Sequence, residues 1–511
     1  MNGSTGKRPN IVFIITDQQR YDTIAANGFD HMITPNLDRL AARGAVFEKM
    51  YITSPSCAPS RASLFTGTYP HTNGVFRNDE EWSYCWVKDL AEAGYHTVNV
   101  GKMHTWPVEG AFGFHERHVT ENKDRDHPTL PFYLDNWDKA YFARGKEKPS
   151  RVTQRRRQGY ENLMGAWVWE DEDILHPDVL VPQMAKWWIE RYPGEEPFFL
   201  QIGIPGPHPP YDPTQEYLDK YEGRELPAPI PADDIADQPA AYRMLRQRHL
   251  DDDADGIVHL PDPSPEQADR QRRHYYANVT MIDDQIGEIL DALEARGVLD
   301  QTVVIFTSDH GDCLTDHGHS QKWNMYESTI HVPAIVVWPG LTDGGRRIRA
   351  LVSLFDFAPT ILEMAGVTVP DWMEARSLSP LLRGGREERP RVFCEHSNDA
   401  LLEGTRMVTM VREGDLKLVH FVDSDEGQLF DLAADPLEMN NLWNDPAQSK
   451  TKTRLIDEIL HWRTESALKT QGYPLACIRG AMAMMSPPGR PGKGQHREGS
   501  RGPRTWTLGI E

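Results

Sequence analysis

The sequence predicts an α/β fold, with a large mixed, mainly parallel sheet sandwiched by helices and a smaller C-terminal α+β domain. Short runs that are apolar on both faces, at 11–16, 198–204 and 302–307, are typical of central parallel strands. Helical patterns separate these runs, and such alternation favours a parallel sheet. The chain has 511 residues, more than one simple core usually holds, so two structural units are expected.

The first part of the chain alternates helices and strands in a regular order. Thr34 followed by Pro35 is typical of a helix N-cap with proline at the first helical position, and Gly44 marks the end of that helix. A second helix is expected to begin just after Cys57 and to stop near Gly67. The elements predicted next are a short helix at 88–93 and a strand at 96–100.

Two segments interrupt this alternation. Residues 105–195 contain many Trp, Arg and acidic side chains with little periodicity, and we interpret them as an insertion that packs around one end of the sheet. Residues 222–265 are rich in Pro and Asp and are predicted to form a long surface excursion. A helix is then expected over 266–296, because apolar residues recur there in steps of three and four. Segments 334–338 and 356–365 complete a first domain that is predicted to span residues 1–385.

A domain boundary is predicted near residue 385, in the run RGGREERPR. The smaller α+β domain is expected over residues 386–477, and its predicted elements are strands at 391–394, 407–412 and 416–420 and a helix at 453–467. Residues 478–511 are rich in Gly, Pro and Arg and are predicted to form an extended C-terminal arm. Because this arm is too polar to pack a core of its own, we expect it to dock on a neighbouring subunit.

The charge balance excludes some classes of partner. Lys and Arg total 55 and Asp and Glu total 76, which gives a formal net charge of −21. A field of this sign repels phosphate backbones and anionic lipids, so we expect no nucleic-acid partner and no membrane partner. The sequence also lacks the run of about 18 apolar residues that a membrane span requires. An anionic substrate would therefore need a local positive site.

The N-terminal sequence and the cysteines predict a location. The start, MNGSTGKRPNIVFIITDQQ, does not fit a signal peptide, because its apolar run is short and has no small-residue cleavage site. Five cysteines are scattered without a CxxC pair, at positions 57, 85, 313, 394 and 477. The odd count and the missing export signal favour reduced thiols, so a cytoplasmic location is expected.

The first motif with chemical meaning is the sequence CAPSR at 57–61, followed by Thr66 and Gly67. It places Cys57 in a turn, a Pro and a Ser at the start of a helix, and Arg61 in the first helical turn. A helix N-terminus lowers the pKa of a thiol and attracts anions, which favours a reactive cysteine. The alternative is a buried structural cysteine beside an ordinary N-cap.

Possible metal ligands follow two predicted strands. Asp17 and Gln18 end the first strand, and Asp309 and His310 follow the strand at 302–307. Parallel strands place ligands at their C-terminal ends, so these side chains should converge. Oxygen and nitrogen donors suit Ca²⁺, Mg²⁺ or Mn²⁺, and the imidazole favours Mn²⁺. Taken alone, an Asp after a strand is usually a helix N-cap, but the pairing of both strand ends with the cysteine turn favours a metal site.

Four further side chains lie just past predicted strands or close to the second metal motif: Lys102, His104, His208 and Lys322. Each of them alone is more often a surface charge or a loop histidine. Together with Arg61 they would supply the local positive site that an anionic substrate needs.

Taken together, these motifs resemble the sulfatase family of the alkaline-phosphatase-like superfamily, and its arylsulfatase and phosphonate monoester hydrolase branch in particular. The family pattern comprises an N-terminal Asp motif, CxPSR with a following Thr-Gly, GKxH, a downstream His, an SDxG metal motif and a Lys. All occur here in that order, between residues 17 and 322. The stretch at 427–442 is similar to the family's closing DLxxDPxExxNL segment, so the resemblance covers roughly residues 8 to 470.

The resemblance implies a catalytic first domain that hydrolyses sulfate esters. In the family, a separate formylglycine-generating enzyme oxidises the CxPSR cysteine to formylglycine, and the hydrated aldehyde attacks sulfur. Carried over by motif, Cys57 would be the nucleophile precursor. One divalent metal, Mn²⁺ or Ca²⁺ with Mg²⁺ as a third candidate, would bind to Asp17, Gln18, Cys57, Asp309 and His310. The related branch also implies a homo-oligomer, a dimer or a tetramer.

The remaining motif residues receive roles in the same way. Arg61 and Lys102 would stabilise the hydrate and its anion, and His104 would deprotonate the second hydroxyl. His208 and Lys322 would clamp the sulfate group and assist the leaving group. Asn78, in the turn after the Cys57 helix, is a candidate substrate contact, although an ordinary turn asparagine explains it as well.

Two departures from the family pattern keep a second function open. Gln18 stands where many sulfatases have a second Asp, and His310 stands where Asn is common. Both changes resemble the phosphonate monoester hydrolase branch, so the alternative is hydrolysis of small-molecule phosphonate monoesters or phosphodiesters at the same, promiscuous site. A non-catalytic binding protein is disfavoured, because burying so many charges without a ligand is costly. A phosphomutase is also disfavoured, because it normally uses a Ser or Thr nucleophile and two metals, and the Asp17-Gln18 motif does not supply the ligands for a second metal.

Overall fold

The computed structural model describes residues 8–121, 123, 134–342, 344–386, 389–397 and 402–473. The predicted arm at 478–511 and the fifth cysteine lie outside these residues, so docking of the arm stays a prediction. The other four cysteines are buried free thiols. Within the described part of the chain, no helix combines the length and the apolar character needed to cross a membrane.

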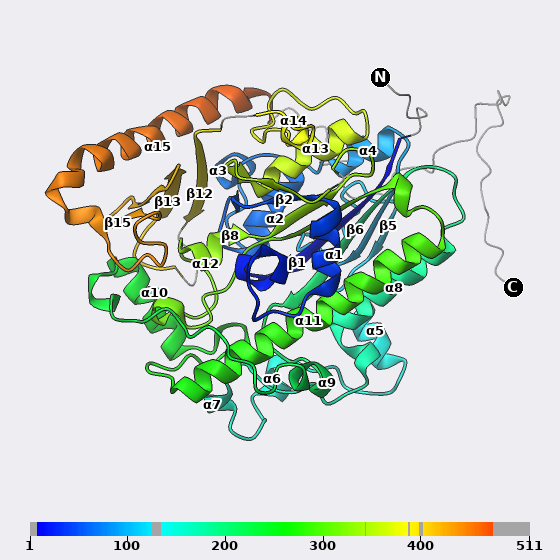
Figure 1. Ribbon diagram of the computed structural model, residues 1–511, viewed down its shortest axis with the longest axis horizontal. Helices are drawn as coiled ribbons and strands as arrows, with labels where there is room; N and C mark the ends of the chain where they lie inside the picture. The colour runs from blue at the N-terminus through cyan, green and yellow to red at the C-terminus, as the bar shows by residue number, and fades with distance from the viewer. Residues whose placement is uncertain are drawn as a thin grey trace, which may run out of the picture.

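An eight-stranded sheet forms the centre of the molecule (Figure 1). Its strand order is β10 (Arg346–Ile348), β2 (Ala45–Phe47), β9 (Ala334–Val337), β7 (Thr302–Ser308), β1 (Asn10–Asp17), β6 (Phe198–Pro207), β4 (His96–Gly101) and β5 (Glu116–His118). β9 runs antiparallel to both of its neighbours, and all other neighbouring strands are parallel. The mixed, mainly parallel sheet predicted from the sequence is therefore confirmed.

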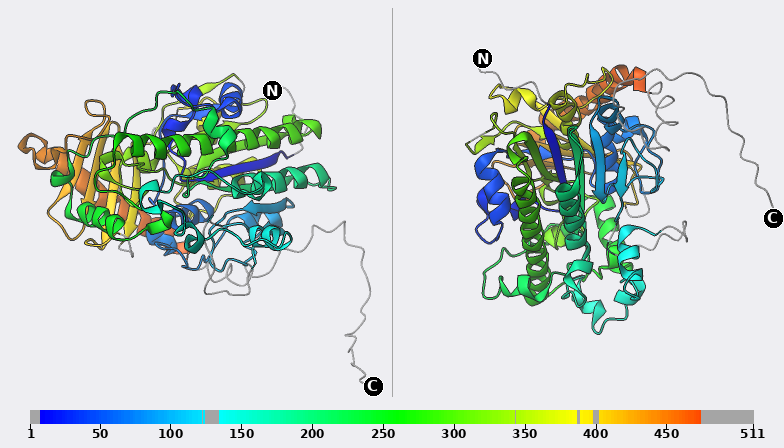
Figure 2. Two further views of the ribbon diagram at one scale, coloured as in Figure 1. Left: turned by 90° about the horizontal axis from the view of Figure 1, so that it is seen from below. Right: turned by 90° about the vertical axis from the view of Figure 1, so that its right-hand side faces the viewer.

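The central strand β1 shows why this sheet needs helices on both faces. Val12 and Ile14 belong to one hydrophobic core, whereas Ile11, Phe13 and Ile15 belong to another, and all five are fully buried. The first core is completed by α1 (Pro35–Arg43), α8 (Pro177–Arg191) and α11 (Pro265–Ala295). The second is completed by α2 (Cys57–Thr66), α4 (Val87–Glu92) and α13 (Phe357–Met364). Figures 1 and 2 show α8 and α11 side by side along one face.

The start of α1 is capped differently from the sequence prediction. Thr34 occupies the N-cap position, but its side chain accepts no capping hydrogen bond there. Instead, the carboxylate of Asp283 on α11 accepts hydrogen bonds from the backbone N–H groups of Asn36 and Leu37, at 3.0 and 2.7 Å. A cap supplied by a residue about 250 positions away satisfies the same N–H groups as a local cap, so helix propensity alone could not predict it.

The segment interpreted as an insertion, 105–195, contributes to the central domain more than expected. Its strand β5 forms one edge of the main sheet, and its last helix, α8, covers a face of that sheet. The remaining helices of the segment are short: α5 (Asn136–Phe142), α6 (Arg151–Gln154) and α7 (Tyr160–Leu163). The 222–265 segment also contains structure, namely α10 (Ala240–Asp251) and the 3-10 turn η5 (Ala254–Gly256).

The C-terminal unit is a four-stranded antiparallel sheet covered by a long helix, at one end of the molecule (Figure 2, yellow to orange). Its elements are β12 (Arg391–Ser397), β13 (Met407–Glu413), β14 (Leu416–Phe421), β15 (Gly427–Asp431) and α15 (Ser449–Lys469). Phe393 on β12 stacks on Trp462 of α15, with ring centroids 4.4 Å apart. Both belong to the second core, so this sheet and the main sheet share one hydrophobic interior.

Short elements complete the described chain. A small sheet joins β11 (Val352–Ser353), β3 (Met50–Tyr51) and β8 (His331–Val332). The remaining short helices are α3 (Pro70–Asn73), α9 (Gln215–Asp219), α12 (Glu327–Ile330) and α14 (Ser379–Leu382).

Candidate active site

Four predicted site residues meet because four neighbouring strands end together. Asp17 is the last residue of β1, and Lys102, His208 and Asp309 follow directly after β4, β6 and β7. The order β7-β1-β6-β4 makes these strand ends adjacent, and all three neighbouring pairs in this order are parallel. The four side chains are at most 2% exposed. The convergence expected at the C-terminal ends of the strands is present.

A pair of glycines allows β4 and β6 to approach closely beneath Lys102. Gly101 and Gly203 face each other in the register of these strands. A Cβ atom on Gly203 would lie 1.8 Å from the carbonyl oxygen of Lys102, and one on Gly101 would lie 2.2 Å from the carbonyl oxygen of Gly203. Both contacts are too short for any side chain, so glycine at both positions keeps Lys102 in place.

Helix α2 brings Cys57 and Arg61 to the same point. All ten residues of α2 are buried, and Cys57 is its first residue. Ser60 Oγ donates a 2.7 Å hydrogen bond to the backbone oxygen of Asp309. Arg61 Nε donates to Asp309 Oδ2 at 2.6 Å, and Arg61 also donates to the backbone oxygen of Lys102 at 3.0 Å. The helix N-terminus, with its partial positive charge, therefore points into the site.

Four residues form a cluster that could hold a cation. The potential ligand atoms of Asp17, Cys57, Asp309 and His310 all lie within 4.8 Å of one another. Asp17 Oδ1 and His310 Nε2 are 3.4 Å apart, and both are buried without a hydrogen-bond partner among the described residues. Buried polar atoms are normally paired, so these two atoms would be satisfied as ligands of a cation. Two carboxylates and an imidazole are a donor set for a divalent metal.

Gln18, the fifth predicted ligand, is held from both sides. Its amide oxygen accepts a 2.8 Å hydrogen bond from Lys322 Nζ, and its amide nitrogen donates to Asp312 Oδ2 at 2.7 Å. Its backbone N–H donates to Asp309 Oδ1 at 3.1 Å. The residue adopts a left-handed φ of 71°, which is uncommon outside glycine. The amide oxygen, with two lone pairs, can serve Lys322 and a metal together.

The surroundings of Cys57 favour a negative charge at its side chain. Burial alone would raise the pKa of the thiol, but Lys322 and Lys102 outweigh this effect and hold the pKa well below its usual value. Lys322 Nζ lies 3.4 Å from Cys57 Sγ, and His104 lowers the thiol pKa in the same direction. Lys102 also forms an ion pair with Asp17. The local positive site that the net charge of −21 requires is therefore present.

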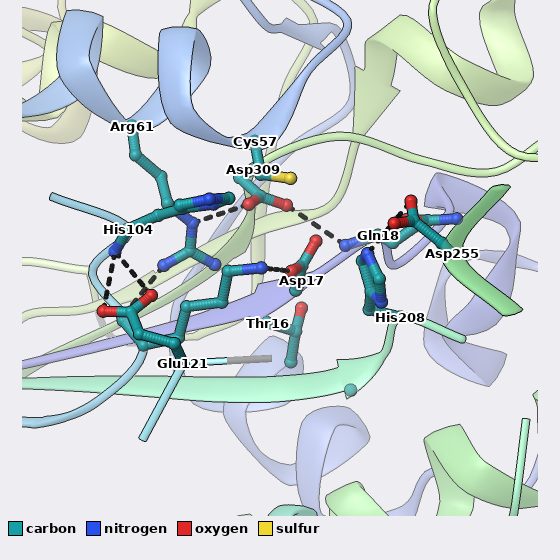
Figure 3. Close-up of polar contacts among 12 residues, drawn as sticks. Thr16, Asp17, Gln18, Cys57, Arg61, His104, Glu121, His208, Asp255 and Asp309 are labelled. Carbon is teal, nitrogen blue, oxygen red and sulfur yellow. Dashed lines mark hydrogen bonds and ion pairs between the residues drawn. The ribbon is translucent and has the colours of Figure 1, made fainter. Parts of the chain in front are cut away.

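Figure 3 shows how the side chains divide around Asp17. Arg61, His104 and Cys57 lie on one side, whereas His208 and Asp255 lie on the other, beside Gln18. The backbone N–H of His104 donates to the Glu121 carboxylate, with its nearer oxygen at 3.1 Å.

Asn78 is the predicted site residue that the structure connects least. It lies in a turn after α3 and is half-buried. Its amide oxygen is buried and accepts no hydrogen bond from the described residues. No hydrogen bond or ion pair within the described chain links Asn78 to the other site residues, so its role stays a prediction.

Four polar residues of the site were not found by sequence reasoning: Glu121, Arg151, Asp255 and Asp312. Asp312 lies three residues after Asp309, so its distance from the metal motif was an available signal. The other three lie in segments without periodicity, where nothing in the sequence separates them from the many other charged loop residues.

The chain shares its sequence pattern with known proteins over most of its length. The family model named Sulfatase matches residues 9–367, and the model named N-sulphoglucosamine sulphohydrolase, C-terminal, matches residues 315–465. An arylsulfatase from Clostridium perfringens (strain 13 / Type A) is 31% identical, over 92% of this chain and 99% of the relative. A choline-sulfatase from Rhizobium meliloti (strain 1021) is 32% identical, over 91% of this chain and 88% of the relative.

The fold is shared with solved structures as well. A phosphonate monoester hydrolase from Silicibacter pomeroyi superposes with a TM-score of 0.75, covering 90% of this chain and 96% of that chain. The two sequences are 23% identical, so this likeness shows a common fold alone.

Proposed function

The chain belongs to the sulfatase family, and we propose that it hydrolyses sulfate monoesters of small molecules with a formylglycine nucleophile made from Cys57. The observation that supports this most strongly is the position of Cys57. It is the first residue of a buried helix, and it lies within 4.8 Å of Asp17, Asp309 and His310. Its thiol pKa is held well below its usual value, despite burial, because Lys322 and Lys102 favour a negative charge at this point.

One divalent cation fits between the buried ligand atoms. Asp17, Asp309, His310 and the residue at position 57 would hold it, with Gln18 as a further oxygen donor, and the imidazole favours Mn²⁺ over Ca²⁺ or Mg²⁺. In formylglycine the donor at position 57 is oxygen, so the sulfur in this structure stands for that oxygen. A bound cation supplies Lewis-acid stabilisation of negative charge on the nucleophile and on the ester oxygens.

The protein's own side chains have separate tasks around this point. Arg61 and Lys102 hold the carboxylates of Asp309 and Asp17 in position through ion pairs. His104, which lies on the same side of Asp17 as Cys57, would remove a proton from the hydrated aldehyde. His208 lies on the opposite side of Asp17, beside Gln18 (Figure 3), and Lys322 donates to the Gln18 amide oxygen. These two residues would bind the sulfate oxygens and the leaving oxygen.

The charge of the site favours singly charged esters. Sulfate monoesters have one negative charge, whereas phosphate monoesters have nearly two at neutral pH. One divalent cation with Arg61, Lys102 and Lys322 suits the single charge, because a second charge has no second metal to neutralise it. Phosphonate monoesters and phosphodiesters have the same single charge. Gln18 and His310 match the residues that the phosphonate monoester hydrolase branch has at these motif positions. Their hydrolysis at the same site is the second candidate function.

A substrate panel tests this proposal. One preparation is assayed with p-nitrophenyl sulfate, a phenyl phosphonate monoester, a phosphodiester and p-nitrophenyl phosphate. We expect the highest kcat/KM for the sulfate ester and lower values for the phosphonate and the diester. The phosphate monoester should be the poorest substrate. If the phosphate monoester gives the highest kcat/KM, the argument from charge is wrong and the chain acts as a phosphatase.

Peptide mass spectrometry tests the nucleophile. The tryptic peptide of residues 50–61 contains Cys57 as its only cysteine. In active protein, made together with a formylglycine-generating enzyme, we expect the mass of the aldehyde form. Full activity in a preparation with an unmodified thiol contradicts the proposal. Cys57→Ala is the matched control, because alanine cannot form the aldehyde.

A further inference from the structure

Asp255 lies outside the short sequence motifs that resemble the sulfatase family. It lies in η5, and its side chain is 13% exposed. Its Oδ1 accepts a 2.6 Å hydrogen bond from Arg151 on α6. Its Oδ2 lies 3.6 Å from His208 Nε2 and 4.0 Å from Lys322 Nζ. The carboxylate therefore faces both residues proposed to assist the leaving group, His208 (Figure 3) and Lys322.

The orientation of the His208 ring is determined by its neighbours. Nδ1 lies 2.9 Å from the backbone oxygen of Pro209, and a carbonyl oxygen only accepts, so Nδ1 must donate its hydrogen there. Nε2 then faces Asp255. The 3.6 Å separation is an ion-pair distance and too long for a hydrogen bond, so an N–H at Nε2 can still be donated to another oxygen.

We propose that Asp255 is a positioning residue that keeps the Nε2–H of His208 directed at the leaving oxygen of the ester. This inference rests on the proposed function. The attacking oxygen of the hydrated aldehyde at position 57 forms a bond to sulfur as the bond between sulfur and the leaving oxygen breaks. The electron pair of the broken bond stays on the leaving oxygen, and the proton moves from His208 Nε2 to that oxygen. The product alcohol leaves neutral, and His208 is left as the neutral ring with hydrogen on Nδ1.

The carboxylate of Asp255 is well suited to stay charged in this position. Burial opposes its ionisation, but His208, Lys322 and Arg151 outweigh that effect and hold its pKa well below the usual range. Its backbone has a left-handed φ of 53°. Asp and Asn tolerate this conformation better than other side chains except glycine, so Asp255→Asn removes the charge while keeping shape and backbone preference.

Asp253 provides a matched control on the same loop. Both of its carboxylate oxygens accept 2.6 Å hydrogen bonds from Arg155, and one also accepts from Tyr160 at 2.8 Å. It therefore has the same Asp–Arg chemistry two residues away. No hydrogen bond or ion pair in the described chain links it to His208 or Lys322, so its removal should leave the chemistry intact.

The test compares two aryl sulfates of different leaving-group strength, p-nitrophenyl sulfate and 4-methylphenyl sulfate. General acid assistance is worth about 10² to 10⁴-fold and matters most for the poorer leaving group. For Asp255→Asn we expect kcat/KM to fall about 50-fold with the methylphenyl ester and less than about 5-fold with the nitrophenyl ester. For Asp253→Asn we expect changes within about 2-fold for both esters.

The ratio of the two rates makes the test independent of folding. Both esters are assayed on one preparation, so a smaller fraction of folded enzyme lowers both rates equally and leaves their ratio unchanged. An equal fall with both esters, or no fall, overturns the role of Asp255. In a His208→Gln background the same ratio should no longer respond to Asp255→Asn, because the two residues act as a unit. A response of wild-type size there also overturns it.

Failure of this inference and failure of the proposed function look different. If the wild-type enzyme hydrolyses aryl sulfates but the ratio does not change in Asp255→Asn, the function stands and the inference is wrong. If the wild-type enzyme hydrolyses only aryl phosphonate monoesters, the function is wrong. The same ratio, measured with nitrophenyl and methylphenyl phosphonates, then decides the role of Asp255.

Discussion

The two sides of the site differ in the secondary structure that supplies their residues. The side that holds the nucleophile consists of strand ends and the first turn of α2, and its side chains are buried. The opposite side depends on the irregular segments at 105–195 and 222–265, which supply Arg151 and Asp255, together with His208 from the end of β6. Regular elements can hold a reactive group rigidly, whereas loops can change without loss of the fold. We infer that the first side carries out the hydrolysis that is common to the family. The second side adapts the enzyme to a particular leaving group.

The largest effect is expected on the nucleophile side. In Asp309→Asn, metal content should fall and kcat/KM should drop by more than about 10³-fold, because a principal charge at the reacting atoms is lost. Elemental analysis and steady-state kinetics measure both. Asp291→Asn, at an exposed ion pair with Arg39, is the control and should change neither. Equal metal content in Asp309→Asn and wild type would show that this side does not hold the cation.

On the opposite side, His208→Gln should separate chemistry from metal binding. We expect kcat/KM to fall about 10²-fold, the usual size of one acid catalyst, while metal content stays at the wild-type level. Both Asp309→Asn and His208→Gln should lose activity, but only Asp309→Asn should also lose the metal. If elemental analysis finds that His208→Gln also lacks the cation, the two sides are not independent.

The close approach of β4 and β6 predicts a loss of stability. In Gly203→Ala the new Cβ would lie 1.8 Å from the carbonyl oxygen of Lys102, so the strands must separate. We expect about 3 kcal/mol of lost unfolding free energy in urea denaturation, as for overpacked cores. Gly223→Ala is the control, because nothing lies within 4 Å of its Cβ and only its left-handed φ of 71° opposes alanine. Similar losses in both variants would mean that contact with Lys102 is unimportant.

The smallest effect concerns the acid stability of the segment at 222–265. Burial lowers the pKa of His249 to about 3 and that of His259 to about 4. The unfolded chain binds these protons near pH 6.5, so below this value it holds more protons than the folded chain. Stability is therefore full above pH 6.5 and is lost as the pH falls toward 4. In His249→Phe the loss should be smaller, by up to about 1.4 kcal/mol per pH unit.

Urea denaturation at pH 7.5 and pH 5.0 checks this prediction. Both ring nitrogens of His249 lack a hydrogen-bond partner among the described residues, and the ring packs against Trp323 at 5.5 Å. A phenyl ring can therefore replace it without losing a hydrogen bond. The exposed His461 is the control, and His461→Gln should show the wild-type dependence on pH. An unchanged dependence in His249→Phe would exclude this histidine as a cause of acid lability.

The difference between regular elements and segments without periodicity also explains which features the sequence could predict. Apolar runs such as 11–16 and 302–307 identify buried strands, and a residue that follows such a run lies at the shared edge of the sheet. For this reason Asp17 and Asp309 could be placed together without a structure. Helix α8 was missed although Val181, Ala185 and Trp188 have helical spacing, because many charged and aromatic neighbours obscure the pattern. Asp255 could not be found, because no periodicity relates its loop to His208.

The burial of α2 limits the stage of folding at which Cys57 can be modified. All ten of its residues are packed inside, and Cys57 is 3% exposed. Another enzyme could not reach that thiol with its own catalytic groups once the domain has closed. The oxidation proposed for Cys57 therefore belongs to the nascent or unfolded polypeptide, before α2 packs. If Cys57 is oxidised as proposed, a molecule that folds before it is modified keeps the thiol, and the active fraction of a preparation then depends on the relative rates of folding and modification.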